Sequence, residues 1–206
     1  MSKNNEVEDK FKKLLDLTEG DYKAFLYDCD GTLADNMEDH KKTYQKVAAE
    51  RGVQIDPAIV DEMAGYPATE VVAEINKRFG SNLDPEEFDK ARSAMFEKEY
   101  IPVTKPMEFV VRHLKASAGK YKIAVVSGSS RKTVTKTLDV LEITSFVDEL
   151  ICADDYEKGK PSPDPFLKAA EKLAVEPSRC IVFEDGEPGV QAAAAAGMKS
   201  IRVDQL

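Results

Sequence analysis

Residues 24–36 read AFLYDCDGTLADN, an apolar run that stops at two aspartates, Asp28 and Asp30. The run predicts a buried strand, and because side chains two apart on a strand point the same way, we expect both carboxylates at its carboxyl end. Carboxylates this close repel each other, so either one keeps a proton or a cation compensates them. Gly31 permits the sharp turn that would expose both in a crevice. A bare pair of aspartates is better explained by a strand end with turn-forming residues, so the interpretation depends on the residues downstream.

Length and charge limit the classes of partner. At 206 residues the chain is long enough for one full-sized domain plus a smaller one. Its 29 lysines and arginines against 38 aspartates and glutamates give a net charge of −9 without a basic block, which argues against nucleic acid and membrane partners. The N-terminal residues form no apolar signal segment, so we expect a cytoplasmic protein. Its three cysteines lie in apolar runs without metal-ligand spacing and are expected to be reduced, buried thiols: Cys29, Cys152 and Cys180.

A helix is predicted over residues 5–18, before the first strand. After that strand, residues 36–104 show helical patterns and no strand pattern. Within this stretch, four helices are expected to begin at Asn36, at Asp56-Pro57, at Pro67 and at Asp84-Pro85-Glu86-Glu87, the last of which has the form of a capping box. We therefore predict an all-helical cap domain, residues 36–104, inserted into a core domain made of residues 1–35 and 105–206.

From Pro106 onward, helical and strand patterns alternate. The predicted helices cover residues 106–118, 130–141, 163–174 and 189–196. The predicted strands cover residues 121–127, 149–153, 179–184 and 199–203. Strands separated by helices of this length imply right-handed crossovers, so the core is expected to be an α/β fold with a doubly wound, Rossmann-like parallel sheet. Ligands of such sheets bind at the carboxyl ends of the strands.

Three further polar clusters fall at those strand ends: Ser127-Gly128-Ser129-Ser130, Lys160 within GKPSPDPF, and Glu184-Asp185-Gly186. The first brings backbone N–H groups, hydroxyls and a helix start together, as an anion site requires, although Ser130 acting as a plain helix cap explains part of it. A loop lysine is usually solvated, but the glycine and prolines beside Lys160 fix its loop. Four carboxylates on one sheet edge demand a cation, and an all-oxygen donor set indicates Mg²⁺.

Taken in order, DCDGT, VVSGSS, GKPSPD and FEDGEPGVQAAAAAGM resemble the haloacid dehalogenase superfamily, specifically its phosphatases with a helical cap inserted after the first strand. The resemblance covers the chain from Ala24 onward. It implies that Asp28 is the nucleophile, Asp30 the general acid and base, and Ser127 and Lys160 the groups that bind the transferring phosphoryl group. It implies phosphoryl contacts from Gly128 and Ser129, and a Mg²⁺ ion held by Asp28, the carbonyl of Asp30 and Asp185, with Glu184 at or just outside the metal shell.

Two details of the motifs carry expectations of their own. The resemblance suggests a cis peptide bond between Lys160 and Pro161. It also shows a departure at Gly186, where such proteins often have serine, so the metal loop is braced without a hydroxyl.

Other functions remain as alternatives. A dehalogenase of the same superfamily would not need Asp30, and a non-catalytic binding protein would not need every charged group of the mechanism. A sugar-phosphate mutase similar to β-phosphoglucomutase has a nearly identical core but needs cap cations for a second phosphate, and this chain has Ala68 and Met95 near the expected positions.

The expected reaction is therefore Mg²⁺-dependent hydrolysis of a small phosphorylated metabolite, a sugar phosphate with one phosphate group, by a monomer or weak dimer. Within the cap, His40 matches a substrate-contacting histidine of the β-phosphoglucomutase-like group by its distance from Asp28. Arg92 on the fourth cap helix is either a cation for a sugar hydroxyl or second phosphate, or a solvated surface residue.

Overall fold

A five-stranded parallel sheet forms the centre of the computed structural model, which describes residues 3–206. Its strand order is β5-β4-β1-β6-β7, and all four neighbouring pairs are parallel. The strands are β1 (Ala24–Tyr27), β4 (Lys122–Val126), β5 (Glu149–Ile151), β6 (Cys180–Glu184) and β7 (Lys199–Arg202). The predicted doubly wound α/β core is thus confirmed, with the quoted stretch in the central strand.

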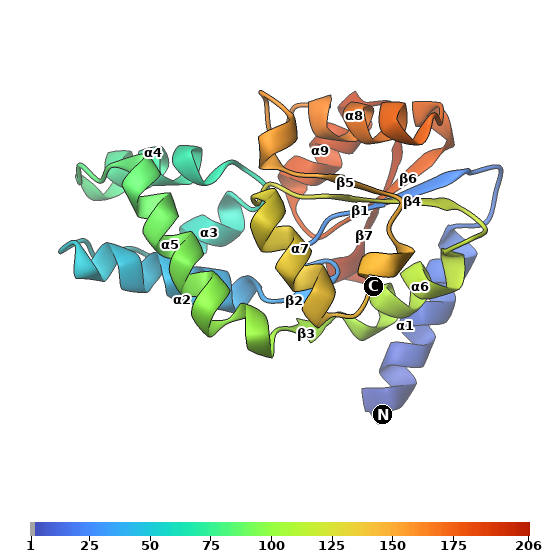
Figure 1. Ribbon diagram of the computed structural model, residues 1–206, viewed down its shortest axis with the longest axis horizontal. Helices are drawn as coiled ribbons and strands as arrows, with labels where there is room; N and C mark the ends of the chain where they lie inside the picture. The colour runs from blue at the N-terminus through green and yellow to red at the C-terminus, as the bar shows by residue number, and fades with distance from the viewer. Residues whose placement is uncertain (1–2) are drawn as a thin grey trace.

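Helices cover both faces of this sheet (Figure 1). Phe25 and Tyr27 point to one face, where they pack with α1 (Lys3–Leu17), α6 (Glu108–Ser117) and α7 (Arg131–Val140). Ala24 and Leu26 point to the other face, against α8 (Asp164–Leu173) and α9 (Glu187–Ala195). Both apolar sets are fully buried because a parallel sheet is covered on both sides, which is why its strands read as continuous apolar runs.

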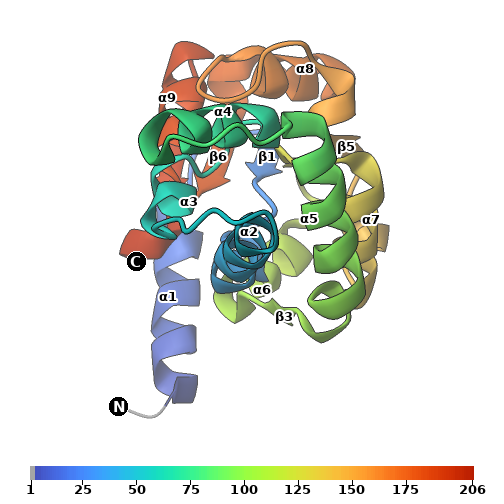
Figure 2. The same cartoon turned by 90° about the vertical axis from the view of Figure 1, so that its left-hand side faces the viewer.

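A helical insert leaves the core after β1 and lies beyond the carboxyl ends of the strands (Figures 1 and 2). Its helices are α2 (Met37–Glu50), α3 (Ala58–Glu62), α4 (Ala68–Phe79) and α5 (Pro85–Glu99). They bury an apolar cluster of their own, with Val72, Ile75 and Phe88 fully buried. A two-stranded antiparallel ribbon of β2 (Ala34–Asp35) and β3 (Lys105–Pro106) joins the insert to the core. The division into two domains at residues 36 and 104 stays a prediction.

Most helix ends follow the expected signals. Asp84 caps α5 by accepting a hydrogen bond from the N–H of Glu87, and Ser130 caps α7 by accepting from Thr133. Several expected boundaries were wrong by two residues: the helix predicted from residue 5 begins at Lys3, and the one predicted from residue 106 begins at Glu108. The helix predicted from residue 189 begins at Glu187, with Pro188 in its first turn, and the strand predicted over residues 149–153 ends at Ile151 because the chain turns into a short 3-10 helix.

The cysteines are buried free thiols, as expected. None of the helices described here is both long and apolar enough to cross a bilayer.

Candidate active site

The four polar clusters of the sequence meet at one edge of the sheet. A cavity of about 640 Å³, counted with its open mouth, separates this edge from the helical insert. Its core wall is formed by the strand-end residues Asp28, Asp30, Ser127, Gly128, Ser129, Glu184 and Asp185. Because β1, β4 and β6 are adjacent and parallel, their carboxyl ends bring these side chains together from distant parts of the sequence.

Lys160 lies behind this wall with no exposed side-chain surface. Its Nζ is 2.6 Å from Asp28 Oδ1, 2.5 Å from Glu184 Oε1 and 3.1 Å from the carbonyl oxygen of Val126. Burial alone would lower the pKa of Lys160, but the Asp28 and Glu184 carboxylates outweigh it and raise that pKa. Lys160 is therefore a buried cation, and the interpretation of a merely solvated lysine is wrong. The Lys160–Pro161 peptide bond is cis, as the resemblance implies.

Negative charge exceeds positive charge around Lys160. One oxygen from each of Asp28, Glu184 and Asp185 lies within 4.8 Å of the other two, so three carboxylates face a single ammonium group. Burial raises the pKa of Asp28 well above its usual range, and Lys160 offsets only part of this. Burial and the charge of Glu184 raise the pKa of Asp185 to about 7. An all-oxygen set with excess negative charge fits a hard divalent cation such as Mg²⁺.

Glu184 is already held by protein groups at both of its oxygens. Oε1 accepts from Lys160, and Oε2 accepts from the N–H groups of Asp185 and Gly186 at 3.1 Å each. Gly189 of α9 lies so close that a Cβ there would overlap this carboxylate. The free oxygens of the set therefore belong to Asp28 and Asp185, and Glu184 braces the loop that carries Asp185.

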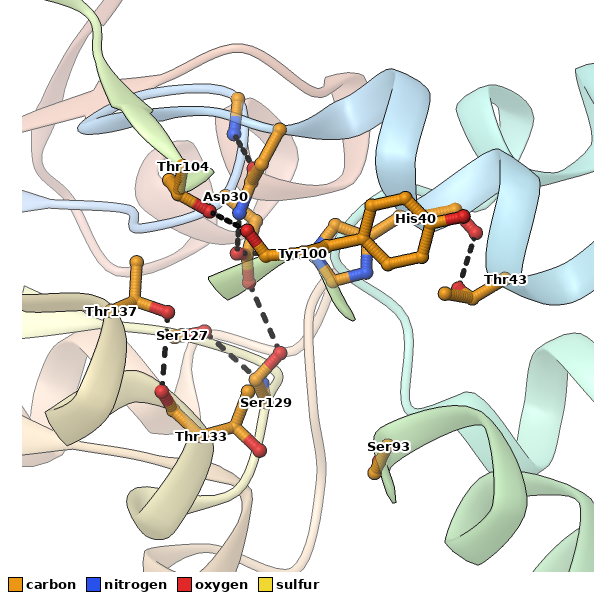
Figure 3. A network of polar contacts seen from close by, with 12 residues as sticks. Asp30, His40, Thr43, Ser93, Tyr100, Thr104, Ser127, Ser129, Thr133 and Thr137 are labelled. Atoms are coloured by element: carbon orange, nitrogen blue, oxygen red, sulfur yellow. Dashed lines mark hydrogen bonds and ion pairs between the residues drawn. The ribbon is translucent and has the colours of Figure 1, made fainter. Parts of the chain in front are cut away.

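Asp30 makes a separate set of contacts, centred on its own carboxylate (Figure 3). It accepts hydrogen bonds from Asn36 Nδ2 at 2.7 Å and Ser129 Oγ at 3.1 Å, and His40 Nε2 lies 3.1 Å from Oδ1 in a contact that is not aligned as a hydrogen bond. Burial would raise the pKa of Asp30, but His40, Asn36 and Ser129 together lower it. The Asp30 side chain is not part of the carboxylate set around Lys160, in keeping with the carbonyl contact that the resemblance implies.

The predicted anion site is present as a loop between β4 and α7. Ser127 is buried, and its Oγ accepts from the N–H of Ser129 at 3.1 Å, which leaves the hydroxyl proton of Ser127 free to donate. Tyr156 fixes the loop from behind by donating to the carbonyl oxygen of Ser127 at 3.0 Å.

Of the two cap residues predicted to contact substrate, both line the cavity and both are buried. His40 stacks on Phe96 with ring centroids 4.0 Å apart. Arg92 is not a solvated surface residue, so that alternative was wrong; its Nη2 pairs with Asp89 at 2.7 Å. Their contact with substrate stays a prediction.

Sequence reasoning missed two contacts that organise the site. Asn36 begins α2 as expected, but its side chain makes no capping hydrogen bond and instead bonds Asp30 and the N–H of Gly31. Thr32 Oγ1 donates to Asp185 Oδ1 at 3.2 Å. Both residues lie in the stretch quoted above, a few positions after the aspartates, and that proximity was the only signal available.

The loop at residues 64–67 of the insert lies directly on the core loops at three glycines. A Cβ at Gly128 would come within 3.2 Å of the carbonyl oxygen of Gly65, and one at Gly159 within 3.0 Å of Pro67. A Cβ at Gly186 would come within 3.3 Å of the carbonyl oxygen of Ala64. The missing side chain at Gly186, a departure from the family pattern, thus gives room for this loop.

Comparison with known proteins agrees with this arrangement. The sequence profile of the haloacid dehalogenase-like hydrolases matches residues 25–203. Fructose-1-phosphate phosphatase YqaB of Escherichia coli is 30% identical over 185 residues, covering 90% of this chain and 98% of that protein. Phosphoglycolate phosphatase of Aquifex aeolicus is 30% identical over 183 residues, covering 86% and 83% of the two chains.

Solved structures share the fold. A hydrolase from Pseudomonas syringae superposes with a TM-score of 0.79 at 19% identity, covering 86% of this chain and 83% of that one. A putative β-phosphoglucomutase from Bacteroides vulgatus superposes with a TM-score of 0.76 at 24% identity, covering 95% and 81%. At these identities the likeness concerns the fold alone.

Proposed function

Because the chain belongs to the haloacid dehalogenase-like hydrolases and is a phosphoric monoester hydrolase of that family, we propose that it cleaves a small sugar phosphate through a covalent intermediate on Asp28. The observation that carries this proposal is the position of Asp28. Its carboxylate lines the cavity 2.6 Å from the buried Lys160, and the hydroxyl of Ser127 lines the same cavity.

The proposed reaction has two steps. A carboxylate oxygen of Asp28 attacks phosphorus, the ester P–O bond breaks, and the departing alcohol oxygen takes a proton from Asp30. Water then attacks the phosphoryl group on Asp28 and loses a proton to Asp30. The bond between phosphorus and the Asp28 oxygen breaks, which regenerates the carboxylate and releases inorganic phosphate. The contacts that lower the pKa of Asp30 hold it as a carboxylate, the form that the second step needs, so Asp30 must take up a proton before the first step.

Asp28 and Asp185 are the residues that would hold Mg²⁺, which, when bound, neutralises phosphoryl charge that would otherwise repel an anionic nucleophile. Lys160 and Ser127 would bind the phosphoryl oxygens. The loop at residues 64–67 would exclude bulk water by lying on the core loops.

A sugar phosphate is favoured because fructose-1-phosphate phosphatase matches nearly the whole of both chains, and a phosphorylated-carbohydrate phosphatase from Thermotoga maritima is 26% identical over 185 residues. A mutase would need a free cation on the insert to bind a second phosphate. Met95 instead packs against the apolar cluster of the insert, and Arg92 is paired with Asp89. Cytoplasmic location and a monomer or weak dimer stay predictions from the sequence.

The test is phosphate release from a panel of phosphorylated sugars and small metabolites with Mg²⁺, by the natural protein and by Asp28→Asn. Asp28→Asn keeps the shape but removes the attacking charge, so we expect turnover to fall to below about 1% of the natural rate while metal-dependent substrate binding persists. A variant that kept more than a few per cent of the rate would contradict the nucleophile assignment.

The same assay separates hydrolysis from mutase activity. Supplied with β-glucose 1-phosphate and a trace of the 1,6-bisphosphate, the protein is expected to release inorganic phosphate as the main product. Accumulation of glucose 6-phosphate faster than inorganic phosphate would overturn the phosphatase assignment.

A further inference from the structure

The insert side of the cavity is an apolar wall. Its members with aliphatic or thioether side chains are Met37, Val60, Met63, Ala64, Ala68 and Val71. Tyr44 and Tyr66 add aromatic rings, and His40, Gly65 and Arg92 complete the wall. Arg92 is the one lysine or arginine among the described residues that line the cavity. Any charge recognition of the leaving group would therefore fall to Arg92.

The charge of Arg92 is already matched within the insert. Nε and Nη2 donate to Asp89 Oδ1 at 3.1 and 2.7 Å, and Nη2 also donates to Ser93 Oγ at 3.2 Å. Nη1 lies 3.4 Å from His40 Nδ1, and the guanidinium stands 5.1 Å over the ring of Tyr44. A guanidinium has five N–H donors, so about one remains for a ligand, enough for a hydroxyl but without an unmatched charge.

The core side of the cavity is acidic, with Asp28, Asp30 and Asp185 in its wall. Lys160 is held at the core end of the cavity, where its Nζ bonds Asp28, Glu184 and the carbonyl oxygen of Val126, so its charge is matched there and is not directed at the leaving group. A second anionic group on the substrate would therefore lose its water and face carboxylates or apolar side chains, with no free cation to replace the water.

We propose that the site selects phosphate monoesters with an uncharged leaving group whose apolar face lies on Val60, Met63 and Val71, and that Asp89 enforces this selection by neutralising Arg92. The proposal rests on the phosphatase function above and adds the class of leaving group. It assigns Asp89, which does not line the cavity, a role in specificity through Arg92.

Paired substrates that differ by one anionic group test the selection. Suitable pairs are fructose 1-phosphate with fructose 1,6-bisphosphate, and glucose 6-phosphate with 6-phosphogluconate. In each pair, the substrate with the uncharged leaving group is expected to have a kcat/KM about 10-fold higher or more at low salt. The ratio of the two kcat/KM values should fall at high salt, because the repulsion is electrostatic.

Asp89→Asn tests the source of the selection. Asparagine keeps an acceptor for Arg92 but removes the neutralising charge, so the charged-to-neutral ratio of kcat/KM should rise about 5-fold or more within this variant. Glu86→Gln is the matched control: it removes one negative charge from the exposed first turn of the same helix, and the ratio should stay within about 2-fold of the natural value.

Measurements of substrate binding test the inference even where no turnover is observed. Calorimetric titration of Asp28→Asn with the same pairs in Mg²⁺ should show weaker binding of each charged member. A charged member that is bound or cleaved as well as its neutral partner, or an unchanged ratio in Asp89→Asn, would overturn the inference and leave the phosphatase assignment intact. If no ester gave Asp28-dependent phosphate release, the phosphatase assignment would be contradicted instead. The calorimetric titration would then still test whether the site binds the uncharged leaving groups more tightly.

Discussion

At the scale of single residues, we expect the largest electrostatic effect on stability from Lys160, because it is fully buried between two carboxylates. Lys160→Met would leave Asp28 and Glu184 buried without a counter-charge. Removing one partner of a buried ion pair typically costs about 3–5 kcal/mol, so we expect a loss of that order in the free energy of unfolding at neutral pH without added metal. Turnover should be lost at the same time, because the phosphoryl group loses its nearest cation.

Urea denaturation of the natural protein and the variant measures this loss. Lys158→Met is the control, since Lys158 is exposed two positions away in the same loop. The loss should shrink in acid, where Asp28 in the variant takes up a proton. An equal midpoint for Lys160→Met and Lys158→Met would contradict the ion-pair argument.

His113 is a second buried residue whose effect can be measured separately, because it does not line the cavity. It is fully buried, with Nδ1 2.8 Å from Tyr27 Oη and Nε2 3.1 Å from Thr18 Oγ1. The Thr18 hydroxyl donates to the carbonyl oxygen of Leu14, so it accepts from Nε2, and Tyr27 donates to Nδ1. Both nitrogens are thus satisfied in the neutral ring, and burial lowers the pKa of His113 from 6.5 to about 4.

The sign of the pH effect follows from this shift. Between the two pKa values the unfolded chain binds the proton and the folded chain does not, so the stabilisation is present above pH 6.5 and is lost as the pH falls toward 4. Relative to His113→Gln, which cannot take up the proton, the natural protein should lose about 3 kcal/mol of unfolding free energy over this range. Denaturation midpoints at a series of pH values measure the difference; parallel curves for the two proteins would contradict it.

At the scale of elements, the contact between the loop at residues 64–67 and the core loops depends on glycine. Gly186→Ala would place a methyl group about 3.3 Å from the carbonyl oxygen of Ala64 and 3.4 Å from its Cβ, so the loop must move by a few tenths of an ångström. Because residues 64–66 of this loop line the cavity, we expect KM for the sugar phosphate to rise about 3-fold to 10-fold.

Two readouts separate this effect from damage to the metal loop. The Mg²⁺ concentration for half-maximal rate should stay unchanged in Gly186→Ala. Adding Ala64→Gly, which removes one of the two close contacts, should restore part of the lost KM. A shift in the Mg²⁺ requirement without rescue by Ala64→Gly would place the defect at Asp185 and not at the loop.

The elements also show where sequence reasoning succeeds. The three inner strands β1, β4 and β6 were predictable because a strand buried on both faces is a continuous apolar run, as in Ala24–Tyr27. Strands β2 and β3 were missed because two residues each cannot show a period, and their pairing joins residues about 70 positions apart. The start of α9 was missed although Pro188 is a typical first-turn residue, so that signal was present and unused.

The residues of the candidate site also fall into those that could be predicted from the sequence and those that could not. Residues at strand ends were predictable, because the topology of a parallel sheet alone brings them to one edge. The apolar wall of the cavity was not, because Tyr44, Val60 and Val71 come from three separate helices whose packing depends on the tertiary structure. The pairing of Arg92 with Asp89 lies between these cases: the two residues are three apart on a predicted helix, a spacing that places them on one face.

At the scale of the whole molecule, the contacts of the N-terminal helix α1 decide whether it is part of the fold or an appendage. Residues 25–203 match the family profile, so α1 lies outside it. In the structure α1 packs on α6, with Leu14 fully buried in the core, Arg112 paired with Glu8 at 3.0 Å and placed 4.3 Å over the ring of Phe11. These contacts make α1 a layer of the core.

Removal of residues 1–18 is therefore expected to destabilise the protein. Leu14→Ala alone should lower the free energy of unfolding by about 2–5 kcal/mol, as for other fully buried leucines, and the truncation by at least as much because Val7, Phe11 and Thr18 are also lost. Leu15→Ala is the control: Leu15, the neighbour of Leu14, is 39% exposed, so the loss should stay below about 1 kcal/mol. A truncated chain with the natural denaturation midpoint would show that α1 is an appendage, and the search for a docking partner would then begin with its exposed face.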